Sequence, residues 1–445
     1  MIPNGVEVID DGAFKGCRNL KTIVIPKTVT KIGEAAFSGC SSLTHIELPD
    51  SVKEIGHSCF YKCTSLKSIR IPNGIEQIDC DTFCRCSSLA AVEIPDSIIV
   101  IGYNAFCGCS SLASIEIPDS VIVIEERAFY DCSSLASICI PYSVKEICCD
   151  AYTGCDSVNF LKIAENNPYY RSEDNCCISK ESQTLVFVCG STSCAPILDY
   201  SASPEKVVIP QGIKKVGWYA FCGLTYFSSV EMPNSVTRIG KRAFANCHFL
   251  KSIEIPDSVT EIESGAFYDC VSLTSIEIPG SVSTIGDNAF CGCESLISVK
   301  IHEGVSEIGN YAFYGCKSLK YIEIPNGLTK IGMNAFEACS LLTSIIIPNT
   351  VYLIGCDAFQ NCSALTYLKI SDCIEQIYCG TFYGCSMLVS VEIPDSVTKI
   401  GDNAFHDCSM LSDIEIPDSV TEIGKYAFCG CSMLTSIEIP YSVKK

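Results

Sequence analysis

Residues 255–277 read Ile-Pro-Asp-Ser-Val-Thr-Glu-Ile-Glu-Ser-Gly-Ala-Phe-Tyr-Asp-Cys-Val-Ser-Leu-Thr-Ser-Ile-Glu, and this 23-residue unit decides the fold because it recurs along most of the chain. The opening Ile-Pro pair returns at this interval from Ile2-Pro3 to Ile439-Pro440, with few departures. A unit of this length is too small to bury a core or to hold an active site alone, so neighbouring units must stack. Function is therefore expected on a repeated surface.

Each unit is numbered here from the Ile of its Ile-Pro pair. Positions 19, 22 and 1 are apolar and positions 21 and 23 are polar, which predicts a short strand with one buried face. Pro at position 2 ends that strand, and Val at 5 and Ile at 8 are expected to point inward. Gly at 9 is expected to permit an unusual backbone angle. A small residue at 12 and an aromatic residue at 13 predict a short helical turn, before Cys at 16 closes the unit.

The aromatic position is the most regular of the unit and predicts a buried structural spine of stacked rings. Tyr152 occupies it once. The phenylalanines of this column are Phe14, Phe37, Phe60, Phe83, Phe106, Phe129, Phe221, Phe244, Phe267, Phe290, Phe313, Phe336, Phe359, Phe382, Phe405 and Phe428.

The Leu-x-x-Ile-x-Ile-Pro pattern resembles the strand signature of leucine-rich repeats. The whole unit, with Ile-Gly-x-x-Ala-Phe-x-Gly-Cys-x-x-Leu, resembles the BspA-like class of leucine-rich-repeat surface proteins. This resemblance implies a leucine-rich-repeat solenoid, a curved right-handed coil with a parallel β-sheet on its concave face. The helical turns of the unit would then lie on the convex side. It also implies a role in adhesion or protein binding, and it carries no catalytic residue.

The repeat pattern predicts one continuous solenoid with a single interruption. Residues 1–162 form an N-terminal leucine-rich-repeat array, residues 163–208 an island, and residues 209–445 a C-terminal array. Within the island, residues 166–175 are rich in turn formers and residues 184–188 resemble a strand, so an inserted hairpin is expected. The island is either a structural spacer or a binding protrusion.

Composition excludes several classes of partner. A formal charge of -20 and a pI near 4.7 disfavour nucleic acid. No apolar run has the length of a spanning helix, so no direct membrane insertion is expected. The chain enters its repeat at Ile2 without a leader, so no export signal or anchor is expected. The compartment stays open, because the resemblance favours the cell surface or secretion whereas the many thiols favour a reducing cytoplasm.

The 33 cysteines are explained largely by the repeat, because 16 of them occupy position 16 and are expected to form a buried column of thiols. Pairs such as Cys84-Arg85-Cys86 could bind a soft metal, but they lack nearby histidines, and no metal or other cofactor is predicted. The five histidines form no column and no catalytic motif is present. The protein is therefore predicted not to be an enzyme and to have no catalytic residue.

Positions 21 and 23 supply the exposed side chains of the strand, and each carries its commonest residue, Ser or Glu, in ten of 17 units. This background is either solvated decoration or a surface for a cationic partner. Departures from it are more informative, because a uniform surface has little means of selecting a partner. One group of departures is Lys300, Tyr321, Ile346, Tyr367 and Lys369, and a second is Phe160, Lys162 and Cys139.

These departures predict binding of a protein or extracellular matrix ligand through the concave face, with the first group as the principal contact. Two alternatives remain open. One is an intracellular leucine-rich-repeat scaffold, and the other is a structural filament that self-associates by end-to-end stacking of uncapped arrays.

Overall fold

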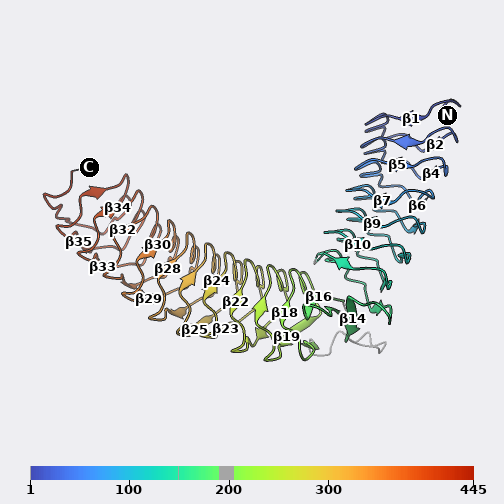
Figure 1. The fold of residues 1–445 in the computed structure, drawn as a ribbon. Coiled ribbons are helices and arrows are strands. Elements are labelled where there is room, and N and C mark those ends of the chain that lie inside the picture. Colours follow the sequence, from blue (N-terminus) through green and yellow to red (C-terminus); the bar gives the residue numbers. More distant parts are fainter. Residues whose placement is uncertain (1, 149, 190–204, 445) are drawn as a thin grey trace. The chain divides into compact units, whose positions relative to one another are not determined.

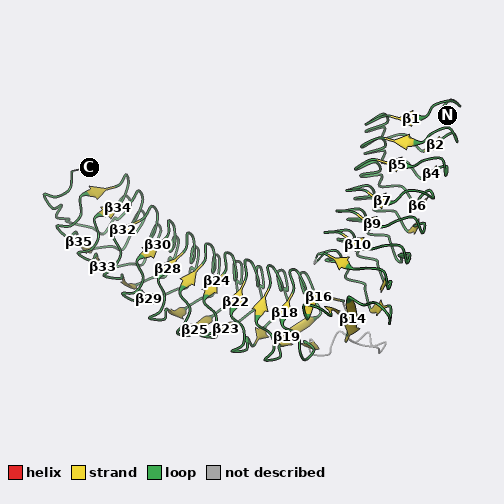
Figure 2. Ribbon diagram, in the orientation of Figure 1, coloured by secondary structure: helices red, strands yellow, loops and turns green. Residues whose placement is uncertain are grey.

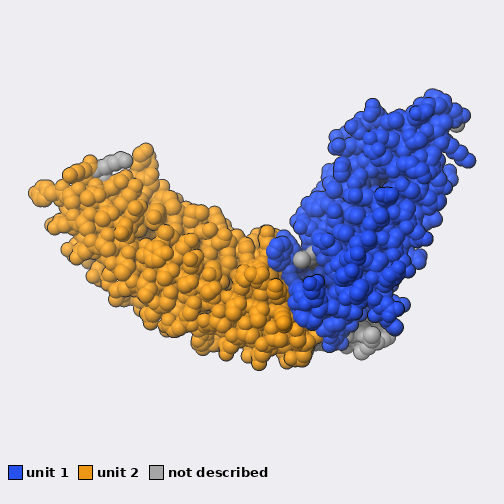
Figure 3. All heavy atoms as spheres, in the orientation of Figure 1, with its two compact units in different colours: residues 1–200, 217–220 blue, residues 201–216, 221–445 orange. Residues whose placement is uncertain are grey.

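The computed structural model describes residues 2–148, 150–189 and 205–444. Residues 190–204, which fall in the expected island, lie outside the described residues. The chain forms two compact units, one of residues 1–200 with 217–220 and one of residues 201–216 with 221–445 (Figure 3). We call them unit 1 and unit 2, and each consists of stacked coils of one repeat each, which is the leucine-rich-repeat solenoid that the sequence predicts.

The strand expected at positions 21 to 1 is present in most coils and pairs in parallel with its counterpart in the next coil. Register follows the repeat, so that Ile276 pairs with Val299 and Ile278 with Ile301. In unit 1 these strands are β2 (Thr22–Val24), β4 (His45–Glu47), β6 (Ser68–Arg70), β8 (Ala91–Glu93), β11 (Ser137–Ile140) and β13 (Phe160–Ile163). In unit 2 they are β17 (Glu205–Val208), β19 (Phe227–Glu231), β21 (Ser252–Ile253), β23 (Ser275–Ile278), β25 (Ser298–Ile301), β27 (Tyr321–Glu323), β29 (Ser344–Ile346), β31 (Tyr367–Lys369), β33 (Ser390–Glu392) and β35 (Asp413–Glu415).

A second parallel ladder, which the sequence analysis did not predict, runs through positions 7 and 8. Figures 1 and 2 show the two ladders of unit 2 as separate rows of strands, with β23 and β25 in one row and β22 and β24 in the other. In unit 1 the second ladder contains β1 (Val8–Ile9), β3 (Lys31–Ile32), β5 (Glu54–Ile55), β7 (Gln77–Ile78), β9 (Val100–Ile101), β10 (Val123–Ile124) and β12 (Glu146–Ile147). In unit 2 it contains β18 (Lys215–Val216), β20 (Arg238–Ile239), β22 (Glu261–Ile262), β24 (Thr284–Ile285), β26 (Glu307–Ile308), β28 (Lys330–Ile331), β30 (Leu353–Ile354), β32 (Gln376–Ile377), β34 (Lys399–Ile400) and β36 (Glu422–Ile423).

The short helical turns predicted around positions 12 and 13 are not confirmed, because the described residues contain no helix. In their place the backbone follows a series of turns in which positions 11 and 15 have positive φ, as at Asn288 (57°) and Gly292 (77°). This alternation directs every second N–H toward the following coil. The N–H of Phe290 donates to the carbonyl of Ala312 at 2.7 Å, and those of Asn288 and Gly292 also reach the next coil. The backbone is thus satisfied between coils rather than within a helix.

The expectation of an unusual backbone angle for Gly at position 9 is wrong. Gly309 and Gly332 do not have positive φ. A Cβ on Gly309 would instead lie 2.6 Å from the backbone N of Asp287, and a Cβ on Gly332 would lie 2.6 Å from that of Asn310. Glycine is needed here because the backbones of neighbouring coils approach closely.

The core of each unit is a column of stacked rings beside a column of thiols. The ring of Phe290 is fully buried, and its centroid lies 5.1 Å from that of Phe267 and 5.3 Å from that of Phe313. The thiol of Cys316 donates a hydrogen bond to the carbonyl of Phe290 at 3.3 Å, and the same contact recurs from coil to coil. Burial raises the pKa of such thiols, to about 12 for Cys132. Cysteine at position 16 is therefore a small apolar residue that also satisfies a buried carbonyl.

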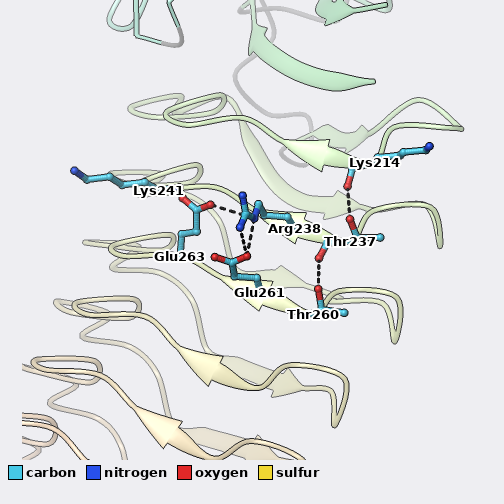
Figure 4. A network of polar contacts seen from close by, with 7 residues as sticks. All are labelled: Lys214, Thr237, Arg238, Lys241, Thr260, Glu261 and Glu263. Atoms are coloured by element: carbon cyan, nitrogen blue, oxygen red, sulfur yellow. Dashed lines mark hydrogen bonds and ion pairs between the residues drawn. The ribbon is translucent and has the colours of Figure 1, made fainter. Parts of the chain in front are cut away.

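Polar side chains also link neighbouring coils at the second ladder (Figure 4). The hydroxyl of Thr260 donates to the carbonyl of Thr237 at 3.1 Å, and the hydroxyl of Thr237 donates to the carbonyl of Lys214 at 3.1 Å. Beside them, the guanidinium Nε of Arg238 donates to Glu261 at 2.7 Å. These contacts repeat at the period of the chain and hold successive coils in register.

The described part of the island contains the expected strand at residues 184–188 and a hairpin before it, whose first strand lies within residues 166–175, where turns were expected. Strands β14 (Tyr170–Glu173), β15 (Cys176–Ser179) and β16 (Thr184–Val188) form an antiparallel meander. The turn between β14 and β15 places Asp174 and Asn175 at positive φ, 48° and 59°, as a type I′ hairpin requires. Asn167, which is fully buried, fixes the entry to the hairpin, because its amide donates to the carbonyl of Pro141 at 2.8 Å.

The island also takes part in the core of unit 1. The ring of Phe187 on β16 is buried and its centroid lies 5.1 Å from that of Tyr152, the last ring of the preceding column. The N–H of Val188 donates to the carbonyl of Ala220, which belongs to the same unit. These contacts favour the structural spacer over the binding protrusion for the described part of the island.

Candidate binding face

The candidate functional site is the outward side of the strand ladder, which we call the strand face and define by positions 21 and 23. Strands on this ladder alternate exposed, buried, exposed, as in β27 and β31. The central residue, such as Ile322 or Leu368, enters the core, so the two flanking residues must face away from it. Because register between coils is fixed, side chains at each position form a row along the unit.

The background of the strand face is acidic. Glu392 on β33 pairs in register with Glu415 on β35, which places two like charges on adjacent strands. Adjacent strands lie about 4.8 Å apart, and like charges at that spacing oppose each other. Both carboxylates are exposed to water, where this repulsion is screened. A row of this kind attracts cations broadly but does not distinguish one partner from another.

The first group of predicted binding residues interrupts this background in unit 2. The side chains of Tyr321, Ile346 and Tyr367 are 54%, 57% and 52% exposed, although large apolar and aromatic side chains are more often buried. They lie on β27, β29 and β31, which follow one another along the ladder. Ile346 pairs in register with Lys369, so an apolar and a basic group are neighbours on adjacent strands. We call these four residues the tyrosine patch.

Lys300, the fifth predicted residue of this group, is engaged differently. Its ammonium lies 2.6 Å from the carboxylate of Glu277 in the preceding coil, and the imidazole of His302 lies 2.5 Å from the same carboxylate. Hydrogen bonds from Lys300 and His302 lower the pKa of Glu277. The charge of Lys300 is therefore compensated within the protein, whereas Lys369 has no ion pair among the residues that the structure describes.

The second predicted group lies in unit 1, on β11 and β13. The ring of Phe160 is 52% exposed and pairs in register with Ser137. Lys162 pairs with Cys139, whose thiol is exposed and free. These residues combine an aromatic ring, a cation and a thiol on one part of the strand face. They form a smaller counterpart of the tyrosine patch.

A groove on the strand face of unit 1 was missed by the sequence analysis. It runs over β2, β4, β6 and β8 and is lined by residues that include Val24, His45 and Arg70. The guanidinium of Arg70 bridges two carboxylates, at 2.9 Å from Asp50 and 3.6 Å from Glu93. The hydrogen bond from Arg70 lowers the pKa of Asp50. Val24, His45 and Arg70 all replace the usual Ser or Glu, so the rule that identified the tyrosine patch would also have identified this groove.

Within residues 2–148, 150–189 and 205–444, no three side chains of His, Cys, Asp or Glu gather in a way that could hold a metal ion. In that part of the chain there is also no helix long and apolar enough to cross a membrane.

Comparisons with known proteins show that the chain is similar to bacterial leucine-rich-repeat proteins. The family described as BspA type leucine rich repeat region matches residues 1–88, 76–187, 198–293, 260–378 and 352–445. A leucine rich cell surface protein of Faecalibacterium prausnitzii is 33% identical, with a TM-score of 0.61 over 72% of this chain and 85% of that chain. A leucine-rich repeat protein of Bacteroides ovatus is 28% identical, with a TM-score of 0.51 over 90% of this chain and 88% of that chain. The comparison with curated proteins found no match.

Proposed function

The chain belongs to the BspA-type leucine-rich-repeat family, and from this premise we propose that it is a non-enzymatic protein that binds a protein or matrix partner through its strand face. The observation that carries the proposal is the tyrosine patch. Two tyrosines and an isoleucine, each more than half exposed, interrupt a surface on which serine and glutamate are the commonest residues. Tyrosine dominates binding energy at many protein interfaces because its ring buries a large area with little loss of conformational freedom.

The composition of the patch indicates the chemistry of the partner. Tyr321 and Tyr367 occupy position 21 in coils separated by one further coil, in which Ser344 stands between them. A partner that fits this spacing presents two apolar recesses. Lys369 selects an acidic group near one recess, and the surrounding glutamates favour a basic rim. The second group, Phe160 and Lys162, offers the same pairing of ring and cation for a separate contact.

We also propose that the chain acts at the cell surface. A similar protein of known structure is described as a cell surface protein, which supports adhesion at the surface as the role of this chain. Repeat arrays suit this role because they present an extended row of side chains on a regular backbone.

Binding is tested with the full chain immobilised and probed with a panel of purified extracellular matrix proteins. For a protein that binds, the dissociation constant is then measured for the double variant Tyr321→Ala, Tyr367→Ala. Two hot-spot tyrosines together contribute about 3 kcal/mol, so the Kd should rise about a hundredfold. The matched control is Tyr142→Ala, Tyr352→Ala, because these tyrosines are 53% and 59% exposed but lie outside the strand face. Equal binding by both double variants would remove the tyrosine patch as the contact.

A further inference from the structure

Two cysteines of unit 2 meet at the surface, outside the buried thiol column. Cys356 and Cys379 both occupy position 10, in adjacent coils, two residues after the ends of β30 and β32. Their sulfur atoms lie 2.8 Å apart. That separation is well inside the roughly 3.5 to 4.0 Å of ordinary non-bonded contact. It exceeds the S–S bond length of roughly 2.05 Å by only about 0.8 Å.

The backbone holds these two residues together. The N–H of Asp357 donates to the carbonyl of Cys379 at 2.9 Å, so the two coils are hydrogen-bonded beside the sulfur contact. Cys379 is exposed and Cys356 is partly buried, which leaves the pair open to a small reagent in solution. Proximity is therefore built into the register of the repeat and does not require a chain movement.

The buried thiols of the same coils differ from this pair in two ways. Cys362 and Cys385 are fully buried, and each donates its S–H to a phenylalanine carbonyl, at 3.2 Å and 3.3 Å. Cys356 and Cys379 contact each other instead of a carbonyl, and a reagent can reach them.

We propose that Cys356 and Cys379 form a disulfide that links two coils when the protein meets a small disulfide oxidant such as oxidised glutathione. One thiolate attacks a sulfur of the oxidant, forms a mixed disulfide and releases one glutathione. The neighbouring thiolate then attacks the protein sulfur of that mixed disulfide and releases the second glutathione. Two protein thiols are oxidised to one disulfide, one oxidised glutathione is reduced to two thiols, and the two protons from the protein end on them.

The pKa of Cys379 determines how the rate of disulfide formation should depend on pH, and the position of the pair determines how the disulfide should affect stability. Burial and the contact with Cys356 raise the pKa of Cys379 to about 11, so the reaction should accelerate as pH rises from 7 to 9 and the thiolate fraction grows. The new bond would close a loop of one repeat and tie the coil that carries Tyr367 to the next coil. That loop closure should raise the melting temperature of the oxidised protein.

The experiment uses the full chain, treated with oxidised glutathione, alkylated and digested without reduction. Trypsin cleaves after Lys369, which lies between the two cysteines, so a disulfide appears as a cross-linked peptide pair. The expected result is this pair, with loss of the alkylatable thiols of Cys356 and Cys379 at a rate independent of protein concentration. Cys356→Ser and Cys379→Ser should each abolish the pair and leave the remaining cysteine as a glutathione mixed disulfide.

Cys373→Ser is the matched control, because Cys373 is an exposed thiol of the same coils without a neighbouring sulfur contact among the described residues. It should leave the cross-linked pair intact. The melting temperature should rise on oxidation of the wild type and of this control but not of Cys379→Ser. Separate glutathione adducts on Cys356 and Cys379 in the wild type, or a cross-link that needs two chains, would overturn the proposal.

Discussion

Replacing Phe290 with alanine tests the ring column at one coil. Its side chain is fully buried and stacked between two rings, so the variant loses the transfer free energy of a phenyl group, both ring contacts and the packing around the resulting cavity. Phe-to-Ala changes of this kind cost about 3 to 5 kcal/mol. We take about 4 kcal/mol as the expected loss. Because stability in repeat arrays is shared between neighbouring coils, the loss should be local.

Hydrogen exchange measured by mass spectrometry shows whether the loss of stability is confined to the neighbouring coils. A loss of about 4 kcal/mol corresponds to roughly a thousandfold faster exchange through local opening. We expect this acceleration in peptides that contain Phe267, Phe290 or Phe313, and little change near Phe37. Phe428→Ala is the control within the same column, because its ring is partly exposed and has one ring neighbour among the described residues, at 5.6 Å. It should cost about half as much. Unchanged exchange in Phe290→Ala would refute the ring column as a source of stability.

Three further predictions concern backbone contacts, thiols and the island. Gly309→Ala should lower the free energy of unfolding by roughly 1 to 3 kcal/mol, seen as a lower urea midpoint, because its Cβ would meet the backbone of Asp287. An unaltered midpoint would argue against close backbone approach as the reason for glycine at this position. The Cys132 thiol has a pKa raised from 9.0 to about 12 in the folded state, so its contribution to stability is complete below pH 9 and is lost as pH rises toward 12. In urea titrations under reducing conditions, the free energy of unfolding of Cys132→Val should therefore fall less steeply above pH 9 than that of the wild type, by up to about 1.4 kcal/mol per pH unit. Equal slopes for the two proteins would contradict the raised pKa of Cys132. Asn167→Ala should cost about 2 to 4 kcal/mol in thermal unfolding because it removes the hydrogen bonds that the Asn167 side chain donates to the carbonyls of Pro141 and Val144 and accepts from the N–H of Tyr170. A melting temperature equal to that of the wild type would show that Asn167 does not anchor the island.

The strand of each coil was predictable because its side chains alternate over several positions. In residues 273–278 the pattern runs from Leu273 through Ile276 to Ile278, and only one assignment buries all three. The second ladder was not predictable in this way. Its strands contain two residues, such as Glu261–Ile262, and two residues cannot display a period. Pairing there follows from the stacking of whole coils rather than from the local sequence.

The turns around the aromatic position were predicted as a helical turn, although glycine at positions 11 and 15 of several coils, such as Gly265 and Gly292, permits the backbone angles that the turns adopt. In other coils position 11 carries residues such as Asn288, Arg127 or Tyr311, which adopt the same positive φ. Hydrogen bonds to the next coil stabilise these residues in a region that L-residues rarely adopt. Such bonds depend on the neighbouring coil and are invisible in a single unit.

The candidate binding residues were found by comparing coils with one another, which requires only the repeat register. That comparison located Tyr321 and Tyr367, both of which are exposed in the structure. It did not reveal that Glu277 already neutralises Lys300, because this ion pair joins two different coils. Continuity of the solenoid between the two units, and a concave position for the strand face, remain predictions.

The central claim is that recognition occurs where side chains depart from the repeat on the strand face. Hydroxyl-radical footprinting of the full chain, with and without a saturating bound partner, measures solvent protection at each side chain. We predict protection of Tyr321, Ile346 and Tyr367 and unchanged labelling of Tyr142 and Tyr352. Protection confined to Tyr142, Tyr352 or other side chains away from positions 21 and 23 would contradict it.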